Sequence, residues 1–348
     1  MLTSELDYDL PPELIAQHPV VPRDRSRLMV YNRRTGVVEH RHLPEILSYL
    51  STGDVMVYND SRVLKARVYA RKPTGGRVEL LFLRKQRREV WEALVKPSAR
   101  LRAGTELVPE AGPPGSAAAD GATVTFVLRE HLGEGRWLLE NRSGVKTEAL
   151  LEEIGEMPLP PYIKEELKEP SRYQTIYARA PGSAAAPTAG LHFTPELVEG
   201  IRESGVELKP LTLHIGLDTF RPIDEQSIEL HQIHRESYRL PVGTFEAVAA
   251  AKERGGRVMA VGTTSVRVLE TVFAEPGGQL EGETDLYITP GYRFKAADTL
   301  LTNFHLPRST LLALVMAFTG VDETRRLYRE AISEKYRFYS FGDALLVL

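Results

Sequence analysis

Residues 63–140 contain six short runs that are rich in β-branched and apolar residues and have no helical pattern between them. The runs are 63–69, 77–84, 90–95, 105–108, 122–128 and 136–140. Several alternate apolar and polar residues with a period of two, and turn sequences separate them. Six closely spaced strands of this kind predict a small closed antiparallel β-barrel.

On both sides of this segment the chain has the pattern of an α/β protein. Apolar runs predict strands at 55–58, 208–215, 257–262 and 343–348, and helical patterns cover 244–254, 266–273, 309–318 and 323–335. Pro210 favours an edge or the start of its strand, and Thr244 is the expected N-cap of its helix. We therefore expect a discontinuous α/β (α+β-like) catalytic domain, residues 1–62 plus 150–348, with a six-stranded antiparallel barrel domain inserted at 63–149.

The composition narrows the class of protein. The chain of 348 residues has no cysteine, which excludes disulfides, thiolate metal sites and cysteine nucleophiles. Its start lacks signal-peptide features, and its longest apolar run is too short for a membrane span, so we expect a cytoplasmic protein without a membrane partner. Residues 62–102 hold thirteen Lys or Arg against three acids. That segment favours a polyanion-binding face, although a solvated Arg-rich strand surface is an equal alternative.

The run 182–193 consists of small and turn-forming residues that end in Leu191-His192-Phe193. A backbone without bulky side chains can approach a ligand closely and present its N–H groups. The following Thr194-Pro195-Glu196 reads as the N-cap and first turn of a helix. A Gly/Ala linker is the alternative, but linkers are usually polar. We favour a ligand-binding loop that includes Ser183, Thr188 and His192.

Polar side chains also follow or precede predicted strands. Asn59, Asp60 and Arg62 stand at the carboxyl end of one strand, where open α/β sheets bind ligands, unless they only form an Asx-turn. Arg23 and Asp24 belong to a dense Arg/Asp run that is either an anion clamp or a surface cluster.

Three further groups are candidates. His214 ends a strand and is either a general base or a satisfied core histidine. The turn with Thr263, Thr264 and Arg267 suits an anionic group or serves only as a cap. Asn303 and His305 flank a Phe and could bind a purine-like ring. His231 and His234 resemble a metal pair only superficially.

Taken in order, these motifs closely resemble one family, the S-adenosylmethionine:tRNA ribosyltransferase-isomerases of queuosine biosynthesis. The resemblance runs nearly end to end. It rests on Asp7–Pro11, Arg23–Leu28, Asn59–Arg62, Pro158–Ile163, Tyr173–Ala178, Gly182–Phe193, Thr212–Gly216, Ala260–Arg267, Thr302–Thr310 and Tyr336–Asp343. Three positions depart from the expected pattern: Ser61 for Thr, Asp218 for Gly and Ile233 for Met.

The resemblance implies a barrel set into an α/β domain, and a reaction. The ribosyl unit of S-adenosylmethionine is transferred and isomerised onto 7-aminomethyl-7-deazaguanine in the tRNA anticodon loop. Epoxyqueuosine-tRNA forms, and adenine and methionine leave. S-adenosylmethionine is then a co-substrate and tRNA the partner, with no metal, no true cofactor and a monomeric enzyme expected.

The resemblance also suggests roles for the candidate residues. His192 or His214 would act as base, with Asp60 opposing the sulfonium. Arg62 or the 263–267 turn would hold the methionine carboxylate, and Asn303 and His305 would contact adenine. The rival hypotheses are a non-enzymatic RNA-binding protein built on the barrel and a hydrolase that uses Ser183.

Overall fold

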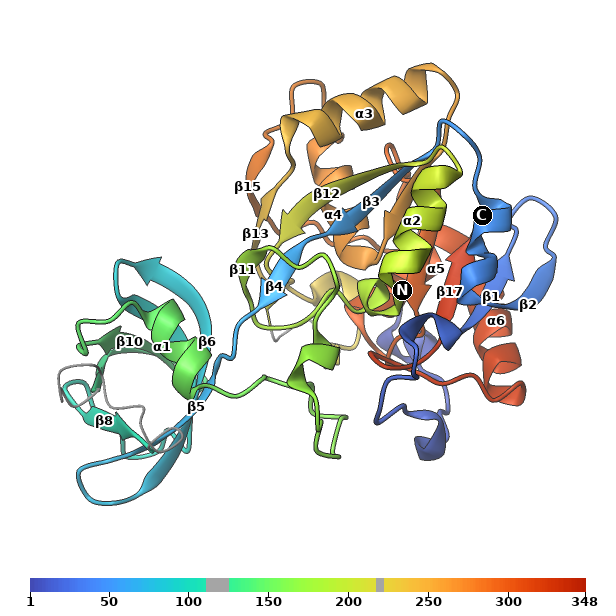
Figure 1. The fold of residues 1–348 in the computed structure, drawn as a ribbon. Coiled ribbons are helices and arrows are strands. Elements are labelled where there is room, and N and C mark those ends of the chain that lie inside the picture. The colour runs from blue at the N-terminus through green and yellow to red at the C-terminus, as the bar shows by residue number, and fades with distance from the viewer. Residues whose placement is uncertain (111–124, 217–221) are drawn as a thin grey trace. The chain divides into compact units, whose positions relative to one another are not determined.

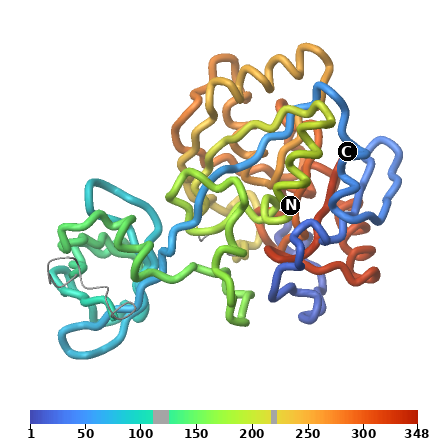
Figure 2. The backbone as a smooth tube through the Cα atoms, in the orientation of Figure 1, coloured from blue at the N-terminus to red at the C-terminus, as the bar shows by residue number. Residues whose placement is uncertain are grey.

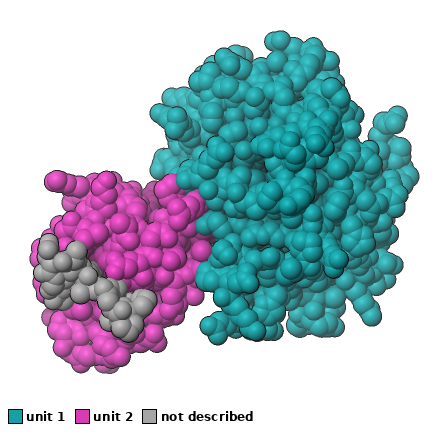
Figure 3. Space-filling model, viewed as in Figure 1, with its two compact units in different colours: residues 1–61, 160–180, 186–348 teal, residues 62–159, 181–185 magenta. Residues whose placement is uncertain are grey.

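The structure is a computed structural model that describes residues 1–110, 125–216 and 222–348. The predicted 112–121 loop, the first part of the predicted 122–128 strand, and Asp218 lie outside these residues. The chain forms two compact units, coloured separately in Figure 3. The first holds residues 1–61, 160–180 and 186–348, and the second holds 62–159 and 181–185.

The second unit contains the closed antiparallel barrel that the sequence predicts. Its strands run in the order β10 (Arg136–Asn141), β7 (Val90–Lys96), β6 (Arg77–Arg87), β5 (Arg67–Arg71), β8 (Glu106–Pro109) and β9 (Phe126–Gly133), and β9 pairs with β10 to close it. Alternate side chains point inward, and Phe82 packs edge-on against Trp91 and Phe126. The unit also includes helix α1 (Thr147–Ile154), so the expected boundary at residue 149 falls within a helix of this unit.

The first unit is built on a nine-stranded mixed sheet (Figure 1). The strand order is β15 (Glu281–Thr284), β13 (Glu236–Arg239), β12 (Glu207–Leu213), β3 (Val55–Asn59), β14 (Val258–Val261), β16 (Thr299–Asn303), β17 (Ala344–Val347), β1 (Arg27–Tyr31) and β2 (Val38–His42). The four neighbours β12, β3, β14 and β16 are parallel. Strand β17 lies between β16 and β1, so the two ends of the sequence run side by side, as the blue and red segments of Figure 2 show.

Helices cover both faces of this sheet. The helices are α2 (Pro195–Glu203), α3 (Val242–Glu253), α4 (Thr263–Val272), α5 (Thr310–Thr319) and α6 (Val321–Ser333). On one face, Leu197 and Ile201 of α2 pack with Met56, Met259 and Leu301 of the strands. Helices α3 and α4 contact β12, β3 and β14. Strands buried on both faces explain the continuous apolar runs in the sequence.

Shorter elements complete the description. The 3-10 helices are η1 (Thr3–Leu6), η2 (Pro12–Leu14), η3 (Arg23–Arg25), η4 (Leu43–Tyr49), η5 (Pro170–Tyr173), η6 (Thr188–His192) and η8 (Ile228–Leu230). Strands β4 (Ser61–Val63) and β11 (Ala180–Ser183) form a two-stranded ladder. Within the described ranges, no helix is both long and apolar enough to cross a membrane.

Two local predictions are confirmed and two are wrong. Thr194 and Ser309 cap α2 and α5, each accepting a backbone N–H three residues on. The expected N-cap at Thr244 is wrong, since α3 begins at Val242 and Thr244 lies inside it. The Thr244 hydroxyl instead donates to the carbonyl of Pro210 (2.7 Å). The expectation that Pro210 marks an edge or the start of its strand is also wrong, since Pro210 lies within β12 and β12 is internal to the sheet. The pairing of β12 with β13 begins only at Thr212, so Pro210 costs no hydrogen bond of that ladder.

Candidate functional site

The four parallel strands bring their carboxyl ends to one edge of the sheet. The register places Asn59 beside Leu211 and Tyr58 beside Val261, which in turn lies beside Leu301. The residues that follow these strands therefore stand next to one another. They are His214 after β12, Asp60 after β3, Thr263 after β14, and Asn303 and His305 at the end of β16. This is the edge at which open α/β sheets bind ligands.

A cavity of about 30 Å³ lies at this edge. It is lined by Ala186, Pro187, Thr188, Ala189, Ile215, Gly262, Thr263, Thr264, Thr302, Asn303, His305 and Leu311. Five of the predicted site residues are among them. The small side chains of the 186–189 segment let the backbone form one wall, as the sequence suggests. Gly262, Ile215, Thr302 and Leu311 are lining residues that the sequence reasoning did not single out.

Asn303 is the centre of a hydrogen-bond network beside the cavity. Its Oδ1 accepts from Thr188 Oγ1 (2.9 Å), and its Nδ2 donates to His192 Nε2 (3.0 Å) and to the carbonyl of Tyr339 (3.2 Å). The imidazole of His192 is 4% exposed. Burial, together with the Arg337 and Arg23 guanidinium charges, lowers its pKa to about 3. His192 is therefore neutral, with the lone pair of Nε2 already engaged.

His305 is held in a similar way. Its Nε2 shares a hydrogen bond with Thr302 Oγ1 (2.8 Å), and its backbone N–H donates to the hydroxyl of Tyr328 (3.0 Å). Burial lowers its pKa to about 3. A neutral, fixed imidazole in the cavity wall suits hydrogen bonding to a heterocycle.

In the polar cluster after β3, the Asn59 side chain is fully paired within the sheet, whereas Asp60 and the neighbouring His214 each keep one polar atom without a described partner. Asn59 joins β3 to β12, because its Nδ2 donates to the carbonyl of Leu213 (3.0 Å) and its Oδ1 accepts the N–H of Leu213 (3.1 Å). Asp60 Oδ1 accepts from Thr212 Oγ1 (2.7 Å). The Nδ1 atom of His214 lies 3.0 Å from Ser61 Oγ. Among the described residues, neither His214 Nε2 nor Asp60 Oδ2 has a hydrogen-bond partner.

The pKa of His214 is lowered by burial, with the Asp60 carboxylate opposing that effect. Its imidazole is therefore uncharged near neutral pH, and its Nε2 has no partner in the described part of the chain. That combination is the one a general base needs.

The first turn of α4 contributes a second open group. Gly262 precedes the helix with φ +85°, a conformation that L side chains rarely adopt, and Gly262, Thr263 and Thr264 all line the cavity. The Thr264 hydroxyl is buried and has no hydrogen-bond partner among the described residues. A helix N-terminus with a spare hydroxyl favours an anion.

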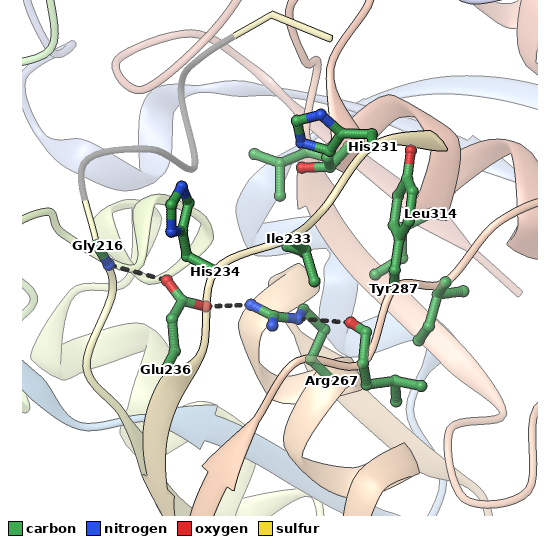
Figure 4. A pocket seen from close by; sticks show the side chains of 12 residues that line it. Gly216, His231, Ile233, His234, Glu236, Arg267, Tyr287 and Leu314 are labelled. Atoms are coloured by element: carbon green, nitrogen blue, oxygen red, sulfur yellow. Dashed lines mark hydrogen bonds and ion pairs between the residues drawn. The ribbon is translucent and has the colours of Figure 1, made fainter. Parts of the chain in front are cut away.

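Arg267 lies in a different pocket, shown in Figure 4. Its guanidinium forms a buried ion pair with Glu236 and donates to the carbonyl of Leu286 (3.1 Å). Glu236 also accepts the N–H of Gly216 (2.8 Å). Arg267 is thus committed to the protein's own carboxylate.

His231 and His234 line this second pocket, and His231 Nδ1 lies 2.9 Å from Glu225. In the part of the chain that the structure describes, no group of three or more His, Asp or Glu could hold a metal.

The side chains of the remaining predicted residues form hydrogen bonds and ion pairs within the protein. Arg23 donates to the carbonyls of Gln174 (2.6 Å) and Ser171 (3.1 Å), and Asp24 accepts from Thr194 (3.0 Å). In the barrel unit, Arg62 pairs with Glu152 (2.7 Å) and the Ser183 hydroxyl donates to the carbonyl of Ala185 (2.7 Å).

Much of the basic segment of the barrel is neutralised within its own unit. Seven of its thirteen cations form ion pairs, namely Arg62, Lys65, Arg67, Arg71, Arg77, Arg84 and Lys85. No carboxylate partner is found among the described residues for Lys72, Arg87, Arg88, Lys96, Arg100 and Arg102. These six are the cations available to a polyanion.

Known proteins resemble this chain over its full length. A family described as "Queuosine biosynthesis protein" matches residues 3–347. The S-adenosylmethionine:tRNA ribosyltransferase-isomerase of Symbiobacterium thermophilum is 51% identical, and that of Thermotoga maritima is 47% identical, each over 100% of both chains. A crystal structure of S-adenosylmethionine tRNA ribosyltransferase from Thermotoga maritima superposes with a TM-score of 0.57 at 39% identity, covering 99% of this chain and 100% of that one. The chain therefore belongs to the family of queuosine biosynthesis proteins.

Proposed function

We propose that this protein transfers and isomerises the ribosyl moiety of S-adenosylmethionine onto 7-aminomethyl-7-deazaguanine in tRNA. The product is epoxyqueuosine-tRNA, and adenine and methionine are released. Family membership supports this reaction. The observation that carries it in the structure is the row of open polar groups along one strand edge: the Nε2 of His214, the Oδ2 of Asp60 and the hydroxyl of Thr264.

The substrate extends along that row. Pockets that enclose small molecules commonly measure about 300–1,000 Å³, whereas the cavity holds about 30 Å³. A nucleoside sulfonium must therefore reach past the cavity, along the edge toward Asp60 and His214. The adenine end fits beside Asn303, whose Oδ1 retains a lone pair for an amino group, and beside the neutral His305.

The charged end of the substrate meets the two open groups near α4 and β3. The amides of the first turn of α4 and the Thr264 hydroxyl would hold the methionine carboxylate, because a helix N-terminus stabilises negative charge. Asp60 would face the sulfonium through its free oxygen. We do not assign the carboxylate to Arg267, since Glu236 already pairs with it.

His214 is our candidate for the general base. The sulfonium acidifies the adjacent 5′-carbon, so His214 would take a proton from it, and the electron pair would open the sugar ring and expel adenine, which is protonated on leaving. The aminomethyl nitrogen would then add to the 4′-carbon of the unsaturated sugar and lose a proton to solvent. The electron pair returned to the 5′-carbon would attack the C1′ aldehyde left by the loss of adenine. The resulting C1′ alkoxide would displace methionine from the 5′-carbon, which breaks the carbon–sulfur bond and closes the epoxide. His192 would only orient Asn303, because its Nε2 accepts the amide of that residue.

One experiment separates this reaction from its rivals. S-adenosylmethionine labelled in adenine is incubated with the protein and with tRNA that carries either the 7-deazaguanine precursor or guanine at the same position. We expect adenine and methionine release in equal amounts with the precursor tRNA alone. A non-enzymatic RNA-binding protein releases neither, and a hydrolase releases adenine without tRNA. Either result would overturn the proposal.

The partner contacts are testable separately. If the six cations of residues 62–102 that have no described carboxylate partner meet phosphates, tRNA affinity falls steeply with salt. The monomeric state and cytoplasmic location stay predictions, and light scattering on the purified protein checks the first.

A further inference from the structure

A third cavity of the first unit lies outside the site described above. It has a volume of about 400 Å³, against about 40 and 30 Å³ for the two cavities already described. Its walls come from β3, β12, α2 and the segment 176–179. The lining residues are Met56, Tyr58, Ile176, Tyr177, Ala178, Arg179, Phe193, Pro195, Val198, Glu199, Arg202 and Leu208. This volume falls within the range of small-molecule pockets, about 300–1,000 Å³.

Helix α2 turns a complete face toward this cavity. Pro195, Val198, Glu199 and Arg202 are spaced i, i+3, i+4 and i+7, which places them in one stripe along the helix. The core-facing residues of the same helix form another stripe that includes Leu197 and Ile201. The stripe of the cavity is thus next to the core-facing stripe, and Val198 also packs against the core.

Two aromatic rings form the floor of the cavity. The centroids of Tyr58 and Tyr177 are 4.2 Å apart, and Phe193 packs edge-on against Tyr177. Beside them, Ile176 is 42% exposed. The Tyr177 hydroxyl is buried beside Gly190 and has no hydrogen-bond partner among the described residues, so the ring is the part of this side chain that a ligand in the cavity can reach. These two rings, inclined to each other by 46°, offer an aromatic surface on which a heterocyclic base can stack.

The rim of the cavity is cationic. Arg202 donates to Glu199 (3.3 Å), which cancels that charge locally. Arg179 is exposed, and no carboxylate of the described residues pairs with its side chain. The backbone N–H of Arg179 donates to the carbonyl of Asp60 (2.7 Å). This hydrogen bond holds the Arg179 backbone next to the strand edge of the candidate site. A free guanidinium beside aromatic rings is the pattern that binds a nucleotide phosphate and base together.

We propose that this cavity receives one unstacked nucleotide of the tRNA anticodon loop, with its base against Tyr58 and Tyr177 and its phosphate at Arg179. The proposal rests on the proposed function, since it supplies a contact for the same tRNA. Sequence-tolerant recognition of single-stranded loops uses this combination of stacking and charge.

The cavity also shares a wall with the catalytic edge. A Cβ on Gly190 would collide with the Tyr177 hydroxyl and would lie 2.9 Å from the Thr175 methyl. Gly190 belongs to η6, the same short helix as Thr188 and His192. Tyr177 therefore backs the loop that lines the S-adenosylmethionine cavity, and a nucleotide on Tyr177 would press against that loop.

The test measures binding of a fluorescent RNA stem-loop that contains the anticodon loop and the 7-deazaguanine precursor. The variants are Arg179→Ala and Tyr177→Leu, with Arg329→Ala on α6 as a control that removes one exposed cation outside the lining. We expect Arg179→Ala to weaken binding about tenfold and to lower the slope of log affinity against log salt by about one. The KM for RNA should rise with the KM for S-adenosylmethionine unchanged, and Arg329→Ala should match the wild type.

A second series places an abasic site at each single-stranded loop position. One position should cost the wild type about tenfold in affinity, as the loss of one stacked base does, and should cost Tyr177→Leu less, because that variant lacks the ring. Wild-type affinity in Arg179→Ala overturns the proposal. A raised KM for S-adenosylmethionine alone also overturns it, because S-adenosylmethionine would then be the occupant. Equal abasic costs in Tyr177→Leu and wild type overturn it as well.

The two proposals fail separately. If the wild type binds RNA with these dependences but releases no adenine, the proposed reaction is wrong. If adenine release is normal and Arg179→Ala binds like the wild type, only the nucleotide cavity is wrong.

Discussion

The two ends of the strand edge that forms the candidate site contain the same kinds of side chain in different states. Near β16, His192, Asn303 and His305 are buried and bound to one another or to neighbouring groups. Near β3 and β12, Asp60 and His214 each make one side-chain hydrogen bond and keep a second polar atom free among the described residues. We call these the closed end and the open end.

The difference indicates that residue type alone does not decide which histidine reacts. A neutral imidazole with an engaged lone pair positions its neighbours, whereas one with a free nitrogen can accept a proton. The closed end therefore gives the cavity its shape, and the open end is available for chemistry.

The strongest test of this comparison is the pair His214→Ala and His192→Ala. Loss of a general base lowers turnover by about 10²–10⁴-fold, so His214→Ala should lose that much while its melting temperature stays near the wild type. His192→Ala should instead lower the free energy of unfolding by about 1–3 kcal/mol, because the Asn303 amide loses its partner. Adenine release and thermal denaturation measure both effects.

The dependence of kcat/KM on pH is a second test of His214 as the base. Because burial lowers the pKa of His214, its neutral form persists below the ordinary histidine value, and kcat/KM should stay flat down to below about pH 6.5. If His192→Ala loses more turnover than His214→Ala in folded protein, the open and closed ends have been assigned in reverse.

The loss of unfolding free energy at acid pH should come mainly from the closed end. His192 and His305 have pKa values of about 3 when folded and about 6.5 when unfolded. The unfolded chain then binds more protons, so their contribution is complete above pH 6.5 and is lost as the pH falls from 6.5 toward 3. By pH 5 each should cost about 2 kcal/mol of unfolding free energy.

Urea denaturation at pH 7 and pH 5 measures this loss. The variant His305→Gln should lose less stability over that interval than the wild type, and the exposed His42→Gln is the control. An equal pH dependence in His305→Gln and wild type would mean that the closed end does not carry the effect.

The smallest expected effect concerns the Thr264 hydroxyl. Thr264→Val removes a hydrogen bond to a carboxylate in the complex, so the KM for S-adenosylmethionine should rise about tenfold, since such bonds contribute about 1.5–3 kcal/mol. Folding stability should not fall, because the hydroxyl has no partner in the described structure. Thr299→Val is the matched control, since that hydroxyl is also buried and without a described partner but lies outside the cavity lining. A KM equal to that of Thr299→Val would remove Thr264 from the carboxylate site.

The barrel and the core of the α/β sheet could be predicted from sequence because their signals are local. Alternation and turn residues define the barrel strands, and Thr194 and Ser309 cap their helices through neighbouring amides. Thr244 could not be assigned correctly in this way, since its hydroxyl bonds to Pro210 on another element.

For the candidate site, the sequence predicts which residues lie at the strand ends but not which partners their side chains have. The sequence places Asp60, His214 and Asn303 at strand ends, and the parallel pairing brings them together. It does not show that Glu236, thirty-one positions from Arg267 in the chain, neutralises that guanidinium. The cavity at Tyr177 was missed because its walls come from four separate segments.

The position of β17 in the sheet has a consequence for how the chain folds during synthesis. Among the described strands, β1 and β2 join the rest of the sheet only through β17 at residues 344–347, which follows every other strand of the sheet in sequence. The barrel strands, which end at residue 141, leave the ribosome about two hundred residues earlier and can complete their ladder first, as domains generally fold in order of synthesis. A ribosome stalled before residue 344 should therefore display a protease-resistant barrel beside an amino-terminal hairpin that is still cut.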